Sequence, residues 1–126
     1  MMNDEVSDLR DRTKSFALLI IKMFSALPKA EEAKVLGKQV LGKQVLRSGT
    51  SVGANYREAQ RARSKAEFIS KIGDCLKELD ESAYWLELLA DSGIVPQTKL
   101  APLRDECNQL LAIFTTISKK AKSTPS

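Results

Sequence analysis

The chain has 126 residues, of which 43% are hydrophobic and 29% charged, a composition typical of one soluble globular domain. It contains no histidine, so zinc coordination and general-base catalysis near neutral pH lack their usual residue. The first residues are polar and mixed in charge, and the apolar run Phe16–Ile21 is too short to span a bilayer. We therefore expect a cytoplasmic protein without a signal peptide or membrane span.

The net charge of +4 conceals a separation of charge along the chain. Residues 34–65 contain eight Lys or Arg and one carboxylate, whereas residues 66–93 contain two Lys or Arg and seven carboxylates. Alternating apolar patterns and Asn-Gly or Asp-Gly turns are absent, which argues against strands. The sequence therefore predicts an all-α protein with a basic helix followed by an acidic one.

The first expected helix covers residues 6–27 and ends before Pro28. Its apolar residues at helical spacing include Leu9, Phe16 and Ile20, which predict a face turned to the core. Leu18, Leu19 and Ile21 lie off that face, so the middle of the helix is apolar almost all round. A small monomer rarely needs such a helix, and we expect these three residues at an interface between subunits.

The pentapeptide VLGKQ occurs twice in succession, at residues 35–39 and 40–44. A shift of five residues turns an α-helix about 140° beyond a full turn, so the two copies cannot present the same face. The second copy stays in register with the following helix and places Leu41 in the core and Lys43 outside. We interpret the first copy as a tandem duplication, carried either in a loop or as an extension of the helix.

The second expected helix covers residues 40–62. Gly49 and Gly53 each weaken a helix by about 1 kcal/mol relative to alanine. Ser48, Thr50 and Ser51 compete for backbone hydrogen bonds as well. We therefore predict a break near residues 48–53, with close backbone packing where side chains are absent.

One face of the second helix and of the turn that follows it is basic. The candidate nucleic-acid-binding residues on this face are Lys43, Arg47, Arg57, Arg61 and Lys65. Three interpretations are open: a solvated surface, a binding surface for nucleic-acid phosphates, or a contact with a partner subunit. Aromatic residues that stack on bases are missing from this face, which argues against sequence-specific readout.

A row of polar residues runs between the core and the basic face, and its members are Arg47, Ser51, Asn55 and Glu58. In a structural interpretation, Ser51 and Asn55 bind backbone groups freed by the break. Arg47 and Glu58 would then pair with opposite charges, and Glu78 or Glu81 is a candidate partner for Arg47. In the alternative interpretation, the row is a ligand or RNA site.

The third expected helix covers residues 65–92. Ser64 and Glu67 form a capping box at its start, and Gly93 ends it. Its outer face carries carboxylates, and the tryptophan among them suggests an interface anchor. The candidate interface residues on this helix are Glu78, Glu81 and Trp85.

The fourth expected helix covers residues 98–121, and residues 123–126 are expected to fray. Cys75 and Cys107 lie on the core faces of the last two helices and lack the spacing of metal ligands. We therefore expect buried thiols, no metal site and no cofactor. Together, the four helices and their short connections predict an antiparallel up-down four-helix bundle that forms a single domain over residues 1–126.

The segment from Arg47 to Ile94 resembles a known family. The resemblance is strongest at Arg47–Ser48, at residues 51–55, at Glu58, Ser64, Glu67–Phe68 and Glu78, and in the run from Leu86 to Gly93. On these motifs the chain is similar to the bacterial 23S ribosomal RNA intervening-sequence proteins, over roughly residues 9–117. It departs from the family pattern between Pro28 and Arg47, where it is about five residues longer, as the extra VLGKQ copy requires.

The resemblance implies a four-helix bundle that assembles into a homopentameric ring. Some members of the family are encoded in inserts within ribosomal RNA genes. A related branch, the accessory variability proteins of retroelements, binds nucleic acid and a reverse transcriptase. The resemblance brings no catalytic residues.

The residues and the resemblance together favour a non-enzymatic, ring-forming bundle without a small-molecule substrate. RNA or DNA is the first candidate partner. The alternative is an assembly or protein-adaptor module that binds no nucleic acid.

Overall fold

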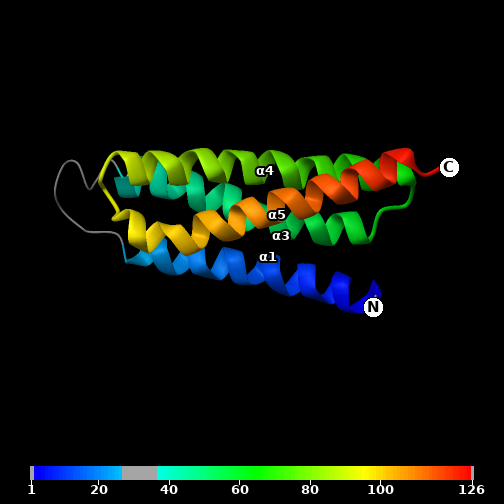
Figure 1. Cartoon of the computed structure of the whole chain (residues 1–126), viewed down its shortest axis with the longest axis horizontal. Coiled ribbons are helices and arrows are strands. Elements are labelled where there is room, and N and C mark those ends of the chain that lie inside the picture. Colours follow the sequence, from blue (N-terminus) through cyan, green and yellow to red (C-terminus); the bar gives the residue numbers. More distant parts are fainter. Residues whose placement is uncertain (1, 27–36, 126) are drawn as a thin grey trace.

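The computed structural model describes residues 2–26 and 37–125. Within these residues the long helices are α1 (Met2–Ser25), α3 (Lys43–Gln60), α4 (Lys65–Asp91) and α5 (Gln97–Ser123). A short π-helical segment, η1 (Gly37–Gly42), leads into α3. The helices lie along one common axis and alternate in direction, so both ends of the chain lie at the same end of the bundle (Figure 1). This arrangement confirms the predicted all-α four-helix bundle.

One apolar core runs along the bundle axis. Each helix contributes buried residues at intervals of three or four, such as Phe16 and Ile20 in α1. The rings of Tyr56 and Phe114 meet edge to face, with centroids 5.6 Å apart and planes at 74°. This contact ties α3 to α5 across the core, in the geometry that aromatic pairs favour.

The break predicted near residues 48–53 is wrong, because α3 runs without interruption from Lys43 to Gln60. A Cβ atom at Gly49 would collide with the side chain of Ile20, and one at Gly53 would lie 3.3 Å from Thr13 Oγ1. The two glycines therefore allow α1 to approach α3 closely, as the sequence predicted. The packing that this approach permits offsets the cost of glycine in a helix, about 1 kcal/mol each.

The first VLGKQ copy is described only from Gly37, where η1 begins. Its described part extends the helix rather than forming a loop. The wider i→i+5 turn of a π-helix accommodates additional residues without ending the helix. Leu41 packs against the core and Lys43 is exposed, as the register of the second copy requires. The predicted end of the first helix, at Leu27 and Pro28, lies outside the described residues.

The predicted caps of α4 are present. The Ser64 side chain accepts a hydrogen bond of 3.0 Å from the Glu67 backbone N–H. The Glu67 carboxylate accepts one of 2.7 Å from the backbone N–H of Arg63, one residue before the position that a capping box uses. Gly93 follows the helix with a φ of 76°, a conformation that glycine adopts without strain.

The helices do not share their contacts equally. α3 packs against both α1 and α4, and α4 also packs against α5, whereas the contact between α1 and α5 is small. Arg12 bridges that contact through two hydrogen bonds to Glu106, of 3.0 and 2.6 Å, and one of 3.2 Å to Gln109. In the described part of the chain, no helix has an apolar stretch long enough to cross a membrane.

Candidate nucleic-acid interface and assembly surfaces

The five predicted cations do not form one free basic band. Lys43, Arg57 and Arg61 are exposed and Lys65 is half-buried. Arg47, in contrast, forms ion pairs with two carboxylates of α4. Its guanidinium nitrogens lie 3.6 Å from Glu78 and 3.3 Å from Glu81. The predicted pairing of Arg47 with the acidic helix is confirmed, and this pairing lowers its contribution to the external positive charge.

Arg57 is instead joined by two cations of α1, Arg10 and Lys14. The three side chains line a groove of about 300 Å³ between α1 and α3. The other residues that line it are small: Thr13, Ala17, Thr50, Gly53 and Ala54. The lining contains no carboxylate, and none of the three cations forms an ion pair with a residue that the structure describes. This α1–α3 groove therefore combines three cations with small residues that leave room for a ligand.

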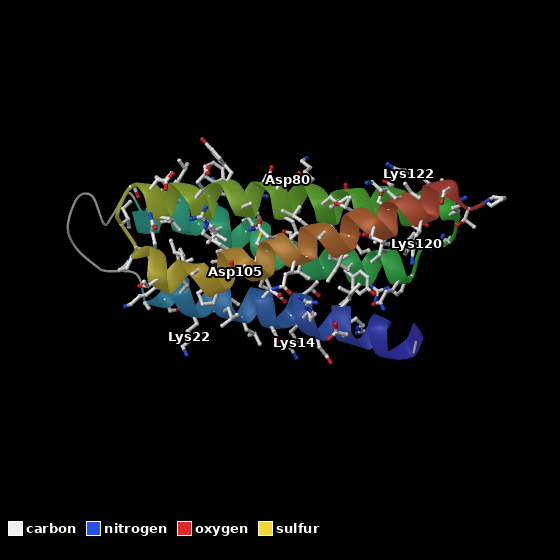
Figure 2. The ribbon with its side chains drawn as sticks, viewed as in Figure 1. Lys14, Lys22, Asp80, Asp105, Lys120 and Lys122 are labelled. Atoms are coloured by element: carbon white, nitrogen blue, oxygen red, sulfur yellow. The ribbon has the colours of Figure 1, made fainter. Side chains whose placement is uncertain are left out.

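Sequence reasoning missed Arg10 and Lys14 as members of the basic surface. A signal for them exists, because Arg10, Lys14 and Ala17 are spaced by four and three residues along one side of a helix. The sequence alone does not say which neighbouring helix that side meets. Figure 2 shows Lys14 and Lys22 pointing away from the bundle along α1.

The turn between α3 and α4 holds a second group of cations, but carboxylates accompany them. Arg61, Arg63 and Lys71 share a groove with Glu58 and Glu67. Lys71 Nζ donates a 2.6 Å hydrogen bond to Glu58. This bond and the charge of Lys71 hold the pKa of Glu58 below its ordinary value, and Glu58 in turn raises the pKa of Lys71. The turn is thus less positive than the α1–α3 groove.

The structural motif predicted around Ser51 and Asn55 is present only in part. Ser51 Oγ donates a 2.7 Å hydrogen bond to the carbonyl of Arg47, within an intact helix. No side-chain hydrogen bond joins Asn55 to any residue that the structure describes. Because α3 does not break, neither side chain replaces a lost backbone hydrogen bond.

A buried polar contact between α3 and α4 was not predicted. Ser48 Oγ lies 2.8 Å from Ser82 Oγ, and each hydroxyl also hydrogen bonds to a carbonyl of its own helix. The pair adjoins Glu78, whose pKa is raised first by desolvation and then by the nearby charge of Glu81. Buried Oγ atoms with satisfied hydrogen bonds fix the register of the two helices at this level.

The residues predicted for an interface differ in how they are exposed. Leu18, Leu19 and Ile21 are 54%, 46% and 42% exposed, a large apolar surface on one helix. Trp85 is half-buried and packs against the core, and its indole N–H has no partner among the described residues. Its neighbour Tyr84, which the sequence analysis did not single out, is 53% exposed.

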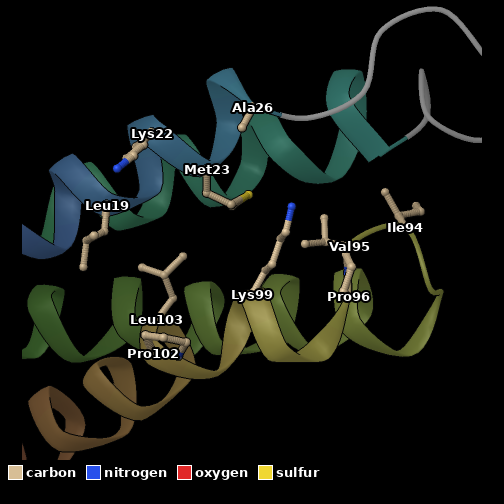
Figure 3. A pocket seen from close by; sticks show the side chains of 10 residues that line it. All are labelled: Leu19, Lys22, Met23, Ala26, Ile94, Val95, Pro96, Lys99, Pro102 and Leu103. Carbon is tan, nitrogen blue, oxygen red and sulfur yellow. The ribbon is translucent and has the colours of Figure 1, made fainter.

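An apolar cavity of about 350 Å³ lies between α1 and the start of α5, as Figure 3 shows. The side chains that line it come from α1, from the α4–α5 turn and from α5: Leu19, Lys22, Met23, Ala26, Ile94, Val95, Pro96, Lys99, Pro102 and Leu103. We call this site the α1–α5 cavity. Its lining contains two lysines and no carboxylate.

Both thiols of the chain lie in the core. Cys75 and Cys107 are buried and free, as predicted, and desolvation raises the pKa of each thiol to about 12. Their sulfurs lie within hydrogen-bond distance of the carbonyls of Val52 and Leu79. No group of three or more Cys, Asp or Glu in the described ranges is placed to hold a metal ion.

These observations define an antiparallel helical bundle whose distinctive features are exposed charged and apolar surfaces. A family model described as 23S rRNA-intervening sequence protein matches residues 7–116. The chain therefore belongs to the 23S rRNA-intervening sequence protein family, as its motifs indicated.

One solved structure supports the same assignment. It is a protein with unknown function from the S23 ribosomal protein family of Bacteroides thetaiotaomicron VPI-5482. That protein is 34% identical to this chain, and the match covers 87% of this chain and 97% of that one with a TM-score of 0.76. The comparison with curated protein sequences found no match.

Proposed function

We propose that this protein is a non-enzymatic bundle that assembles into a cyclic homo-oligomer and binds the phosphate backbone of RNA or DNA. One observation carries the nucleic-acid part of the proposal. Arg10, Lys14 and Arg57 converge from two helices on a groove that contains no carboxylate. Phosphate binding requires only such cations on one surface, because released counterions supply the free energy.

The assembly part of the proposal is supported by the apolar surface of α1. Leu18, Leu19 and Ile21 stand outside the core and would be covered in an oligomer. The family resemblance suggests five subunits in a ring. A ring repeats the α1–α3 groove once per subunit, so one nucleic-acid strand would meet several grooves at a high effective concentration.

The lining of the groove also sets the expected mode of binding. It contains no aromatic residue to stack on bases, so we expect sequence-tolerant binding. Each phosphate neutralised changes the slope of log K against log salt by about 0.7 to 0.9. Three cations per groove therefore predict a steep loss of affinity as the salt concentration rises.

The test compares two sets of charge reversals in the full chain. The groove variant carries Arg10→Glu, Lys14→Glu and Arg57→Glu, and the control carries Lys77→Glu, Lys119→Glu and Lys122→Glu. Both variants change the net charge equally. We expect the groove variant to lose at least about 100-fold in affinity for a labelled single-stranded oligonucleotide, by fluorescence anisotropy at low salt. The control should lose far less.

Equal losses in the two variants would contradict a site in the groove, and unchanged binding by the groove variant would remove these residues from the proposal. Circular dichroism verifies that both variants remain helical.

A role as an assembly or protein-adaptor module without nucleic acid is the second candidate. The observation that favours it is the pairing of Arg47 with Glu78 and Glu81, which neutralises part of the predicted basic face within the chain. An oligomer that binds no oligonucleotide even at low salt would support this second candidate.

A further inference from the structure

The α1–α5 cavity combines an apolar lining with positive charge. Lys22 and Lys99 are exposed, and neither forms an ion pair with a residue that the structure describes. The start of α5 has no side-chain cap and no acidic residue in its first turn, so the helix dipole adds further positive potential there. The cavity therefore suits an apolar group that is accompanied by negative charge.

A surface with these properties exists elsewhere on the same chain. Tyr84, on the outer side of α4, is 53% exposed. Three carboxylates follow the same side of the helix as Tyr84. Asp80 lies four residues before it, Glu87 three residues after it and Asp91 seven residues after it. All three carboxylates are exposed, and none forms an ion pair within the described part of the chain. We call Tyr84 and these three carboxylates the Tyr84 ridge; Figure 2 shows Asp80 on the outer side of α4.

We propose that the Tyr84 ridge of one copy docks into the α1–α5 cavity of a second copy of this chain. The phenol ring would enter the apolar cavity, and the carboxylates would face Lys22 and Lys99. This inference rests on the proposed assembly and names the surfaces that form it.

Charge and aromatic burial both favour a second copy as the occupant. Aromatic side chains bury about 150–250 Å² each and are enriched among the residues that dominate interfaces. The ridge carries three carboxylates and has Arg104 beside it, whereas the cavity carries two lysines and no carboxylate. This difference in charge favours the pairing of ridge with cavity over a contact between like surfaces.

The two surfaces also belong to different sides of the bundle. The ridge lies on α4, and Tyr84 borders the seam between α4 and α5, whereas the cavity lies at the seam between α5 and α1. A contact between two different surfaces is heterologous, so the copy that gives its ridge keeps its cavity free, and the copy that gives its cavity keeps its ridge free. Such contacts close into a ring when the rotation between copies permits.

The first experiment reverses charges on each surface and then on both. Lys22→Glu with Lys99→Glu changes the cavity, and Asp80→Lys with Glu87→Lys changes the ridge. We expect each double variant to weaken assembly at least tenfold by analytical ultracentrifugation. The combined fourfold variant should recover assembly, because its reversed charges again attract. A control, Lys119→Glu with Lys122→Glu, makes the same charge change as the cavity variant at exposed positions outside both surfaces and should assemble like the wild type.

The outcomes separate the inference from the proposed function. A monomeric wild-type chain would contradict the proposed assembly itself. A wild-type oligomer whose assembly survives both double variants, or is not recovered in the fourfold variant, would overturn the inference and leave the assembly standing.

A second measurement does not depend on how well the charge variants fold. A photoreactive phenylalanine analogue at position 84, an exposed position, should cross-link to a peptide from residues 19–26 or 94–103 of another copy, which line the cavity. Adducts confined to other peptides, identified by mass spectrometry, would overturn the inference.

Discussion

The two flanks of α1 pack by different means. Toward α3, Gly49 and Gly53 remove side chains from the interface, so α1 lies directly against the α3 backbone. Toward α5, one ion-pair bridge at Arg12 crosses the seam, with an apolar cavity near one end of α1 and a groove of about 420 Å³ near the other. One flank is closed by the absence of side chains, and the polar contacts across the other, among the described residues, gather at Arg12.

This difference decides which surface remains for partners. On the α3 flank Ile20 is used in the fold, whereas the cations Arg10 and Lys14 remain outside, with the exposed Ile21 on the same side of the helix. On the α5 flank apolar residues line a cavity that the described residues do not fill. The same helix thus offers charge for phosphates on one side and apolar surface for another protein on the other.

The largest effect should come from adding a methyl group to the closed flank. Gly49→Ala places a Cβ against the buried side chain of Ile20, and overpacking of this kind costs about 1–3 kcal/mol. Gly73→Ala is the matched control, because its Cβ would meet no atom within 4 Å. We expect this control to stabilise α4 by about 1 kcal/mol through helix propensity alone. Urea denaturation at a fixed chain concentration measures both.

If Gly49→Ala were as stabilising as Gly73→Ala, the close approach of α1 and α3 would not be needed, and the contrast between the flanks would fail.

A smaller effect should come from the bridge of the open flank. Arg12 makes a two-point contact with Glu106, and the hydrogen bonding that Arg12 donates to that carboxylate is the main reason that the pKa of Arg12 is raised. Both side chains are about one quarter exposed, which limits the strength of the pair. A double-mutant cycle of Arg12→Lys and Glu106→Gln should give a coupling of about 1 kcal/mol.

Hydrogen exchange measures how the Arg12–Glu106 pair affects the local stability of each helix. Exchange should become faster in α1 of either single variant and stay unchanged at the α3–α4 interface. Faster exchange throughout the bundle would instead show that the bridge supports the whole fold.

Sequence reasoning predicted those features of the fold that depend on one helix at a time. The apolar spacing of α1 and the Ser64 cap of α4 depend on local periodicity and local hydrogen bonds, and both are present. The break in α3 was predicted wrongly because glycine propensity is a local property. The close packing that offsets the cost of glycine involves Thr13 and Ile20, which belong to another helix, α1.

The candidate site was predicted in part, for the same reason. Arg57 was found because the α3 face is basic, but Arg10 and Lys14 belong to the groove only once α1 is placed beside α3. Trp85 and Tyr84 are adjacent in the sequence and both lie off the core line. Only the position of the neighbouring helices shows that Trp85 is half-buried and that Tyr84 is exposed.

The α3–α4 interface carries two carboxylates, Glu58 and Glu78, in contrasting surroundings. Lys71 holds the pKa of Glu58 below its ordinary value, so the stabilisation from Glu58 is present above its unfolded pKa and is lost as pH falls through its folded pKa. Desolvation raises the pKa of Glu78, so its stabilising contribution exists below its unfolded pKa and is lost as pH rises through its folded pKa.

The two carboxylates therefore predict opposite effects of the same substitution, which are the smallest that we expect. Near pH 7, Glu58→Gln should lower the free energy of unfolding because it removes a favourable charge. Glu78→Gln should raise it, because the buried charge costs more in desolvation than Arg47 returns across 3.6 Å. Each difference from the wild type should vanish as the pH falls below both the folded and the unfolded pKa of the carboxyl, which for Glu58 requires a more acidic pH than for Glu78. If denaturation curves across this range showed both variants destabilised alike at neutral pH, the Arg47–Glu78 ion pair would outweigh the burial of Glu78.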